Sequence, residues 1–434
     1  MQKKQKGIVW FKNDLRVADN PALQKAIAEN ESVVGVYCFD PKQYATTVYG
    51  FKKTAHFRAQ LTIESVKELR ANLATLGITL LVYHDSASQV IPTLIDSSIQ
   101  TTLYFQNEWT SEEKEEIEKV KKNCGPTVEF VATYHQFLFP PEVIPFSIAE
   151  IPAVFTQFRN ACEKKAVVPK IGKLTAMPES NIIDIQTAIP TLEDLGFTTF
   201  QADRRTAFPF RGGENQALAR LQEYLWTTKK ISQYKLTRNG LIGTDYSSKF
   251  SPWLANGCLS PKTIYWEIKR YEKEIEANES TYWLIFELLW RDYFKYISLQ
   301  NGNAIFKIGG IQNREYQWSQ NKKAIQKWIN GTTAAPFVNA NMLELQQTGW
   351  MSNRGRQNVA SYFAKTLLLD WRIGAAYFES MLLDYDVHSN YGNWMYVSGV
   401  GNDPRDRKFN VALQAQNYDK QSKFQQRWLQ QQLF

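Results

Sequence analysis

The segment at residues 246–261, YSSKFSPWLANGCLSP, joins hydroxyl groups and a cation to the start of a predicted helix. Ser251 is expected to cap this helix, and Pro252 would occupy its first position. The polar residues directly before the cap are Ser247, Ser248 and Lys249. Hydroxyls, an ammonium group and the free amides of a helix N-terminus together suit phosphate. If the segment stood alone, an ordinary capped helix would be the better explanation.

A second segment, FELLWRDYF at residues 286–294, places Glu287 and Arg291 four residues apart on a predicted helix, with Trp290 between them. Such a pair is usually an ion pair on the surface. The apolar and aromatic neighbours indicate partial burial here, and a buried glutamate near a cleft is a candidate for proton transfer.

A third group of polar residues lies between residues 348 and 394. It opens with TGWMSNRGRQN and closes with a predicted turn, rich in Gly and Asn, that holds Asp384, Asp386, Asn390, Asn393 and Trp394. Several polar groups would then converge beside a hydrophobic helix. A capped loop would also explain each of these residues singly.

The elements that must position these residues fall into two regions. Short buried strands are predicted at residues 8–11, 33–39, 79–83, 102–105 and 128–131, with helices between them. Helix starts are marked by Asn20 before Pro21 and by a capping box of Thr110 with Glu113. This alternation predicts an α/β domain with a doubly wound parallel sheet over residues 5–135. The first turn, residues 12–20, contains no glycine, so neither a dinucleotide fingerprint nor a P-loop is expected there.

The second region is helical. Prolines punctuate residues 136–206, which we interpret as a connecting linker with a short helix near 154–164. Strand signals are scarce from there on, so residues 207–434 are expected to form an all-α domain.

Composition limits the classes of function. The net charge is +8, which suits a polyanion such as nucleic acid, although a solvated basic surface would give the same value. The four cysteines are scattered, only four histidines occur, and no CxxC or HExxH is present, so we expect no metal site and a reducing cytoplasm. We find no signal peptide and no apolar run of about 18 residues, and therefore expect no membrane association.

Several motifs resemble one family, the photolyases and cryptochromes, most closely its cryptochrome DASH group. They are WFKNDLRVADNPAL, FTQFRNACE, GGENQALARLQEYLW, TRNG, GTDYSSKFSPWLA and STYW, and the resemblance covers nearly the whole chain. It implies the two-domain architecture expected above, with FAD held in the helical domain.

The resemblance also implies roles at the flavin. The phosphates and ribityl chain would be surrounded by Tyr234, Ser247, Ser248, Lys249, Phe250 and Ser251. Arg291 would add a cation there. Arg356 and Asp384 would pair beside the isoalloxazine, Asp386 would accept from its N3 proton, and Asn390 would face N5.

Light-driven chemistry is the next implication. Trp394, Trp371 and Trp318 align with a chain that carries an electron from the surface to photoexcited flavin, although spacing alone would make them three core tryptophans. Glu287, Trp290 and Asn353 align with residues that hold a cyclobutane pyrimidine dimer flipped out of its strand. The activity implied is that of a deoxyribodipyrimidine photo-lyase, with no net redox change.

The substrate pocket departs from that of duplex photolyases. Gln357 replaces a methionine and Tyr396 a tryptophan, which makes the pocket more polar and favours single-stranded DNA. Ser352 and Asn353 stand where 6-4 photolyases have paired histidines, so that chemistry is disfavoured. Glu108 aligns with a carboxylate that binds a folate antenna, 5,10-methenyltetrahydrofolate, but it would also serve as an acid ahead of the Thr110 cap.

Two other functions remain open. A signalling photoreceptor would use the same flavin and tryptophans, although the chain ends soon after Trp428 and we expect no effector tail. A light-independent nucleic-acid-binding protein would keep flavin only as structure. RNA binding is left open, and a monomer is expected.

Overall fold

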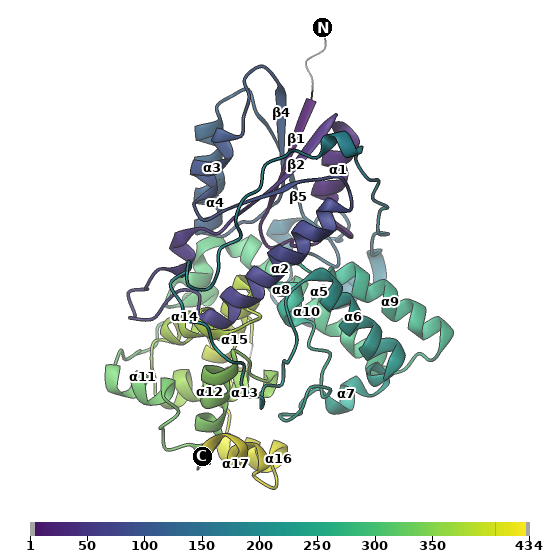
Figure 1. The fold of residues 1–434 in the computed structure, drawn as a ribbon. Coiled ribbons are helices and arrows are strands. Elements are labelled where there is room, and N and C mark those ends of the chain that lie inside the picture. Colours follow the sequence, from purple (N-terminus) through teal and green to yellow (C-terminus); the bar gives the residue numbers. More distant parts are fainter. Residues whose placement is uncertain (1–4, 404, 431–434) are drawn as a thin grey trace.

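The computed structural model describes residues 5–403 and 405–430. A parallel five-stranded sheet forms the first domain, with strand order β3-β2-β1-β4-β5 (Figure 1). Its strands are β1 (Gln5–Phe11), β2 (Ser32–Cys38), β3 (Leu80–Tyr83), β4 (Gln100–Gln106) and β5 (Glu129–Thr133). The prediction of a doubly wound parallel sheet is therefore confirmed.

Helices cover both faces of this sheet because its strands are apolar on both sides. Ile8 and Trp10 point to the face covered by α3 (Ala87–Thr93) and α4 (Ser111–Cys124). Val9 and Phe11 point to the opposite face, where α1 (Pro21–Glu29) and α2 (His56–Ala74) pack. The Asn20 cap of α1 and the Thr110 capping box of α4 are present as predicted.

The rest of the chain is helical. A connecting segment, with α5 (Phe155–Lys165) as its one longer helix among the described residues, leads to the bundle. The bundle helices are α6 (Glu214–Gln222), α7 (Tyr234–Thr237), α8 (Ser251–Ala255), α9 (Pro261–Glu274), α10 (Glu279–Asn301), α11 (Lys322–Ile329), α12 (Pro336–Thr348), α13 (Asn353–Ser361), α14 (Trp371–Met381), α15 (Val387–Ser398), α16 (Val411–Tyr418) and α17 (Lys423–Leu429). Single helical turns cover Pro41–Tyr44, Ile148–Glu150, Glu179–Asn181, Lys230–Gln233, Gly302–Phe306 and Gly310–Gln312, and wider π turns extend α6 at Glu223–Thr227 and α13 at Tyr362–Thr366. In the described part of the chain no helix is long and apolar enough to cross a membrane.

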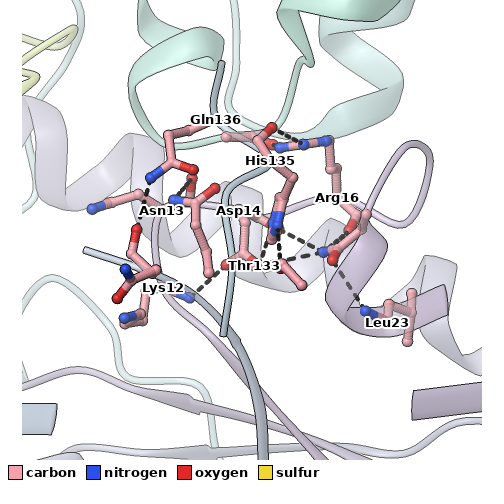
Figure 2. A network of polar contacts seen from close by, with 12 residues as sticks. Lys12, Asn13, Asp14, Arg16, Leu23, Thr133, His135 and Gln136 are labelled. Atoms are coloured by element: carbon pink, nitrogen blue, oxygen red, sulfur yellow. Dashed lines mark hydrogen bonds and ion pairs between the residues drawn. The ribbon is translucent and has the colours of Figure 1, made fainter. Parts of the chain in front are cut away.

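The glycine-free turn after β1 docks the two domains. Leu15 N–H donates to the Asn256 carbonyl at 3.2 Å, and Arg16 Nη1 donates to the Gly257 carbonyl at 2.8 Å. Arg16 also donates to the carbonyl of His135, whose ring lies 3.1 Å from the Asp14 carboxylate (Figure 2). These groups are buried, so the interface between the domains is fixed by directed hydrogen bonds as well as by apolar packing.

Candidate functional site

A cavity of about 770 Å³ lies between the two domains. Its walls come from the carboxyl ends of β1 and β4, from α10 and from the start of α15, and they include Lys12, Gln106, Glu108, Gln136, Arg291, Lys295, Asp386 and His388. This volume is in the range of cofactor sites.

Glu108 is buried in the wall of this cavity, where its Oε1 accepts a hydrogen bond from Gln106 Nε2 at 2.8 Å. Burial, with the Glu113 carboxylate nearby, raises the pKa of Glu108 to about 7. The carboxyl group is thus held in the cavity with little solvent, which suits a ligand that donates N–H groups.

A second, smaller cavity lies in the helical domain, and Tyr385 and Asp386 line both spaces. Arg356 from α13 and Asp384 form its ion pair, with Nη2 2.9 Å from each carboxylate oxygen. The ion pair expected from the sequence is therefore present. Asn390 lines the same cavity and donates from Nδ2 to the Ala375 carbonyl at 3.0 Å, which fixes its amide and directs Oδ1 away from that bond.

Asp386 begins α15 and has two partners. Its Oδ1 accepts from the Ser389 amide at 2.8 Å as a helix cap, and its Oδ2 lies 2.6 Å from Lys295 Nζ. Burial opposes ionisation, but Lys295 holds the pKa of the Asp386 carboxyl far below its usual range. An anion is therefore fixed where the two cavities meet, able to accept a further hydrogen bond from a ligand.

Lys249 is the candidate phosphate ligand with the clearest environment. Its side chain is buried, Nζ donates to Ser247 Oγ at 3.0 Å, and the Tyr246 ring centroid lies 3.0 Å away. Among the described residues no carboxylate oxygen lies within 4.0 Å of this ammonium, and burial lowers its pKa far below the usual value. A buried cation without an anionic partner fits the diphosphate of FAD.

The expected helix cap beside Lys249 is wrong. Phe250 occupies the cap position of α8, Ser251 is the first helical residue, and neither side chain makes a capping hydrogen bond. The helix has only five residues, so its dipole adds little. Ser248 and Phe250 are buried and Tyr234 lies at the start of α7, near Arg238.

Two further expectations need correction. The region around Asn390, Asn393 and Trp394 is the helix α15, not a turn, because Asp386 caps it and Gly392 lets it pack closely against the Phe294 ring. Glu287 does not pair with Arg291. Arg291 donates instead to the Leu254 carbonyl at 3.0 Å.

Glu287 pairs with Arg238, which comes from the end of α7. Burial raises the pKa of Glu287 even though the Arg238 charge lowers it. Trp290, one turn further along α10, stacks on Phe155 with centroids 3.7 Å apart, so only its other face can meet a base. The Trp290 and Tyr396 rings are nearly perpendicular, with centroids 6.0 Å apart.

Asn353 and Gln357 line the smaller cavity from α13. Asn353 is exposed, and Gln357 Oε1 accepts from Arg354 Nη1 at 2.9 Å. Tyr396 is half-buried, with Arg407 beside its hydroxyl. Both polar replacements noted in the sequence therefore have an arginine beside them, but only Gln357 is among the residues that line the smaller cavity.

The three predicted tryptophans lie in the helical domain that holds this cavity. Trp394 lines it and is buried, Trp371 begins α14 and is buried, and Trp318 is half-buried. The strand-like bridge between Ser319 and Leu369 holds the Trp318 segment against the start of α14.

Several residues of these cavities were missed by sequence reasoning. Lys295 lies one helical turn after Arg291, and His388 lies two residues after Asp386. Nothing in the spacing of Lys295 and His388 indicates a role in binding. Lys12 and Gln106 had a usable signal, since each stands at the carboxyl end of a predicted strand, where open α/β sheets bind ligands.

Comparisons with known proteins agree with this architecture. The family described as DNA photolyase matches residues 7–179, and that described as FAD binding domain of DNA photolyase matches residues 283–432. The sheet domain lies almost wholly within the first of these matched regions, and the helices from α11 to α17 lie within the second.

Individual relatives indicate which group within this family the chain resembles most. Proteins named cryptochrome DASH from Danio rerio and Synechocystis are 47% and 45% identical, each over 97% of this chain and over 82% and 87% of their own length. A solved Synechocystis cryptochrome superposes with a TM-score of 0.93 at 44% identity, covering 99% of this chain and 89% of the other. A solved class III photolyase from Agrobacterium tumefaciens superposes with a TM-score of 0.82 at 25% identity, covering 99% of this chain and 87% of the other. The chain belongs to the photolyase and cryptochrome family, within its cryptochrome DASH group, and carries the FAD-binding domain.

Proposed function

We propose that this chain is a deoxyribodipyrimidine photo-lyase that uses light to split cyclobutane pyrimidine dimers and prefers them in single-stranded DNA. The observation that carries the proposal is the smaller cavity. The Arg356–Asp384 ion pair, the Asn390 amide and Trp394 line the same space as Asn353 and Gln357, the residues aligned with dimer recognition.

FAD, when bound in its reduced form and excited by light, would supply the electron that opens the dimer and would take it back afterwards. The chain's own groups hold and shield that site. Arg356 and Asp384 supply a fixed charge pair, and Lys249 supplies a cation for the diphosphate. Asn390 presents a neutral amide, which cannot protonate a neighbouring anion.

Glu287 would hydrogen-bond a pyrimidine carbonyl. Its raised pKa favours the protonated form, which can donate, and the paired Arg238 would have to release it. Trp290 offers one aromatic face for stacking, because Phe155 covers the other. Oxidation of Trp394, Trp371 and Trp318 in turn would carry an electron inward from the surface.

The proposed preference for single strands rests on the polar side chains of Gln357 and Tyr396. Extracting a dimer from duplex costs a few kcal/mol of unpairing and unstacking. Gln357 and Tyr396 are engaged with arginines and offer less apolar contact to offset that cost than Met and Trp would. A single strand avoids much of the cost.

We also propose a light-harvesting folate, 5,10-methenyltetrahydrofolate, in the larger cavity. The buried Glu108 carboxyl is its candidate anchor. A near-ultraviolet band beyond that of flavin, lost in Glu108→Gln, is the expected signature. A deazaflavin in protein from the native host would contradict it.

The test follows a defined dimer in a single-stranded oligonucleotide, in light and in darkness. A photolyase removes the dimer only in light. A signalling photoreceptor binds flavin but leaves the dimer intact, and a light-independent binding protein retains the oligonucleotide equally in both conditions. The double variant Gln357→Met with Tyr396→Trp should gain activity on duplex; no gain would exclude the pocket as the cause of the preference.

A further inference from the structure

Tyr316 lies beside Trp318, one of the three predicted tryptophans. The two rings are tilted by 57° with centroids 5.3 Å apart, and both side chains are partly exposed. The Trp318 amide also donates to the Tyr316 carbonyl at 3.1 Å, so the backbone holds the two residues together. Aromatic rings at this separation are in contact. An electron can therefore pass between Tyr316 and Trp318 in one step.

The Trp318 indole N–H has no group to accept its proton. Although the ring is partly exposed, Nε1 is buried and has no hydrogen-bond acceptor among the residues that the structure describes. An indole that loses an electron becomes a radical cation, and it becomes a weaker oxidant when it then loses its N–H proton. Since Trp318 retains this proton, its oxidised form keeps the full capacity to take an electron from a neighbouring ring.

The Tyr316 hydroxyl, in contrast, has a proton acceptor. It donates to Asp406 Oδ2 at 3.0 Å, and Asp406 Oδ1 pairs with Lys365. Burial opposes ionisation of Asp406, but hydrogen bonds from Lys365 and Tyr316 hold the pKa of this carboxyl below its ordinary value. Asp406 is therefore a carboxylate with one oxygen on the phenol. Its side chain is 43% exposed, so a proton that it receives can pass on to water.

Gly399, at the end of α15, fixes this arrangement. Its φ is +80°, and a Cβ there would lie 2.0 Å from Asp406 Oδ1 and 2.9 Å from the Tyr316 hydroxyl oxygen. The Arg314 guanidinium donates to the Gly399 carbonyl at 2.9 Å. The carboxylate and the phenol thus pack against backbone at the end of the helix that carries Trp394, and they need not move to exchange a proton.

We infer that Tyr316 is a further electron donor of this chain, which reduces oxidised Trp318 and transfers its phenolic proton to Asp406. The inference rests on the tryptophan series proposed above, which supplies the oxidant. The Trp318 radical cation takes one electron from Tyr316 and becomes neutral tryptophan. The O–H bond of Tyr316 breaks, the proton moves to the Asp406 carboxylate, and a neutral tyrosyl radical remains. The Lys365 ammonium, 4.5 Å from the centroid of the Tyr316 ring, disfavours a positively charged intermediate, so the electron and the proton leave together.

A longer-lived reduced flavin is the expected consequence. An electron on the flavin can return directly to a Trp318 radical cation, whereas the tyrosyl radical accepts an electron only together with a proton. Oxidation of Tyr316 therefore slows the loss of the electron from the flavin. It also leaves the radical on a partly exposed side chain, where an external donor can reduce it.

The test illuminates the FAD-containing protein with a short laser pulse, without an external donor, and follows transient absorption and electron paramagnetic resonance. In the wild type a tryptophan radical should form first, and a tyrosyl radical should replace it. Tyr316→Phe should show the tryptophan radical alone, and its reduced flavin should decay at least tenfold faster. Asp406→Asn keeps an acceptor for the hydroxyl but cannot take the proton, so it should slow formation of the tyrosyl radical at least tenfold. The φ of +41° at this position suits asparagine as well as aspartate.

Tyr391→Phe is the matched control. The Tyr391 ring also lies beside a predicted tryptophan, with its centroid 6.1 Å from that of Trp371, but in the described part of the chain its hydroxyl makes no hydrogen bond to a carboxylate. This variant should form the tyrosyl radical as the wild type does.

Three results would overturn the inference and leave the proposed photolyase activity intact. They are a tryptophan radical without a tyrosyl radical in the wild type, a tyrosyl radical that persists in Tyr316→Phe, and an unchanged rate of its formation in Asp406→Asn. Absence of both radicals from the wild type would overturn the inference together with the tryptophan series.

Discussion

At the scale of single residues, the cavities are lined by charges whose environments differ. Asp386 is held ionised by Lys295, whereas burial raises the pKa of Glu108 to about 7. Arg356 and Asp384 neutralise one another at the wall of the smaller cavity. Each of these groups has few partners, so single substitutions test them.

Asp384→Ala should weaken flavin retention. The Asp384 carboxylate is buried and the Arg356 side chain is 24% exposed, so removing the carboxylate leaves a largely buried cation unpaired. Breaking a buried pair costs about 3–5 kcal/mol, and the partial exposure of Arg356 favours the lower end. FAD content after gel filtration and the denaturant midpoint measure the effect. Asp203→Ala, which removes a more exposed pair with Arg205, should leave FAD in place. Unchanged occupancy in Asp384→Ala would show that the pair does not hold the flavin.

Glu108→Gln should change the pH dependence of stability. The pKa of Glu108 rises from its ordinary value near 4.5 to about 7 in the folded chain. Between these values the folded protein holds a proton that the unfolded chain has lost, so stability falls as pH rises from about 4.5 to 7. The variant without folate should lose this component, at most about 3 kcal/mol. Denaturant unfolding at pH 5 and pH 8 measures it. The exposed Glu112→Gln is the control, and an identical pH dependence in Glu108→Gln and wild type would contradict the expectation.

At the scale of elements, α14 and α15 place the tryptophans. Gly374 of α14 lies against the Trp394 ring, where a Cβ would come within 2.3 Å, so the two helices pack closely enough to fix that ring. The Trp371 indole donates to the Ile308 carbonyl at 2.9 Å. Rings held in this way would need no rearrangement for the proposed electron transfer.

Trp394→Phe should sharply slow reduction of the flavin by light and an external donor, with FAD content retained. Phenylalanine keeps the packing but is much harder to oxidise. Absorbance of the flavin under constant illumination gives the rate. The control is Trp428→Phe, which changes a buried tryptophan near the chain's end. Its flavin should be reduced at the wild-type rate. Equal rates for Trp394→Phe and wild type would show that the series of tryptophans does not carry the electron to the flavin.

The sequence predicted elements better than contacts. All five strands were predicted, because their apolar runs are short and are bounded by helix caps such as Asn20 and Thr110. The helix α15 was missed, since Gly392 and its two asparagines suggest a turn, whereas the close packing of Gly392 against Phe294 is visible only in the fold. Glu287 pairs with Arg238, 49 residues away, and no local spacing could indicate that.

Site residues were predicted where a motif aligned and were missed where only the fold brings residues together. The aligned motifs brought Arg356, Asp384, Asn390 and Trp394 to one cavity. Lys12 and Gln106 were missed because only the fold brings both to the larger cavity: Lys12 directly follows β1, and Gln106 ends β4, 94 residues further along the chain. The roles of the motif residues stay proposals until tested.

At the scale of the whole molecule, the domain interface forms one of the two cavities. Gly257 adopts φ +76°, and a Cβ there would lie 2.0 Å from the Asn13 carbonyl oxygen. No side chain fits between the helical domain and the turn after β1. Close approach of these two segments therefore depends on glycine.

Gly257→Ala should loosen the interface. The positive φ costs about 1–2 kcal/mol for alanine, and displacement of the docked turn adds to it. Gly243→Ala is a matched control, since it has φ +88° and no atom within 4 Å of its Cβ. Denaturant unfolding should show a lower midpoint for Gly257→Ala than for Gly243→Ala, with flavin release preceding the loss of helix. Equal midpoints would show that the turn can move aside freely.

The substrate claim belongs to the whole molecule, because the pocket, the basic surface and the state of the DNA decide it together. The measurement is the initial rate of dimer loss per bound reduced flavin, under light, on single-stranded and duplex oligonucleotides of one sequence at one salt concentration. We expect rapid repair of the single strand, much slower repair of the duplex, none in darkness, and binding that falls with salt on both. Equal repair of both substrates would contradict the preference, and an intact single-stranded dimer after illumination would contradict the proposed function.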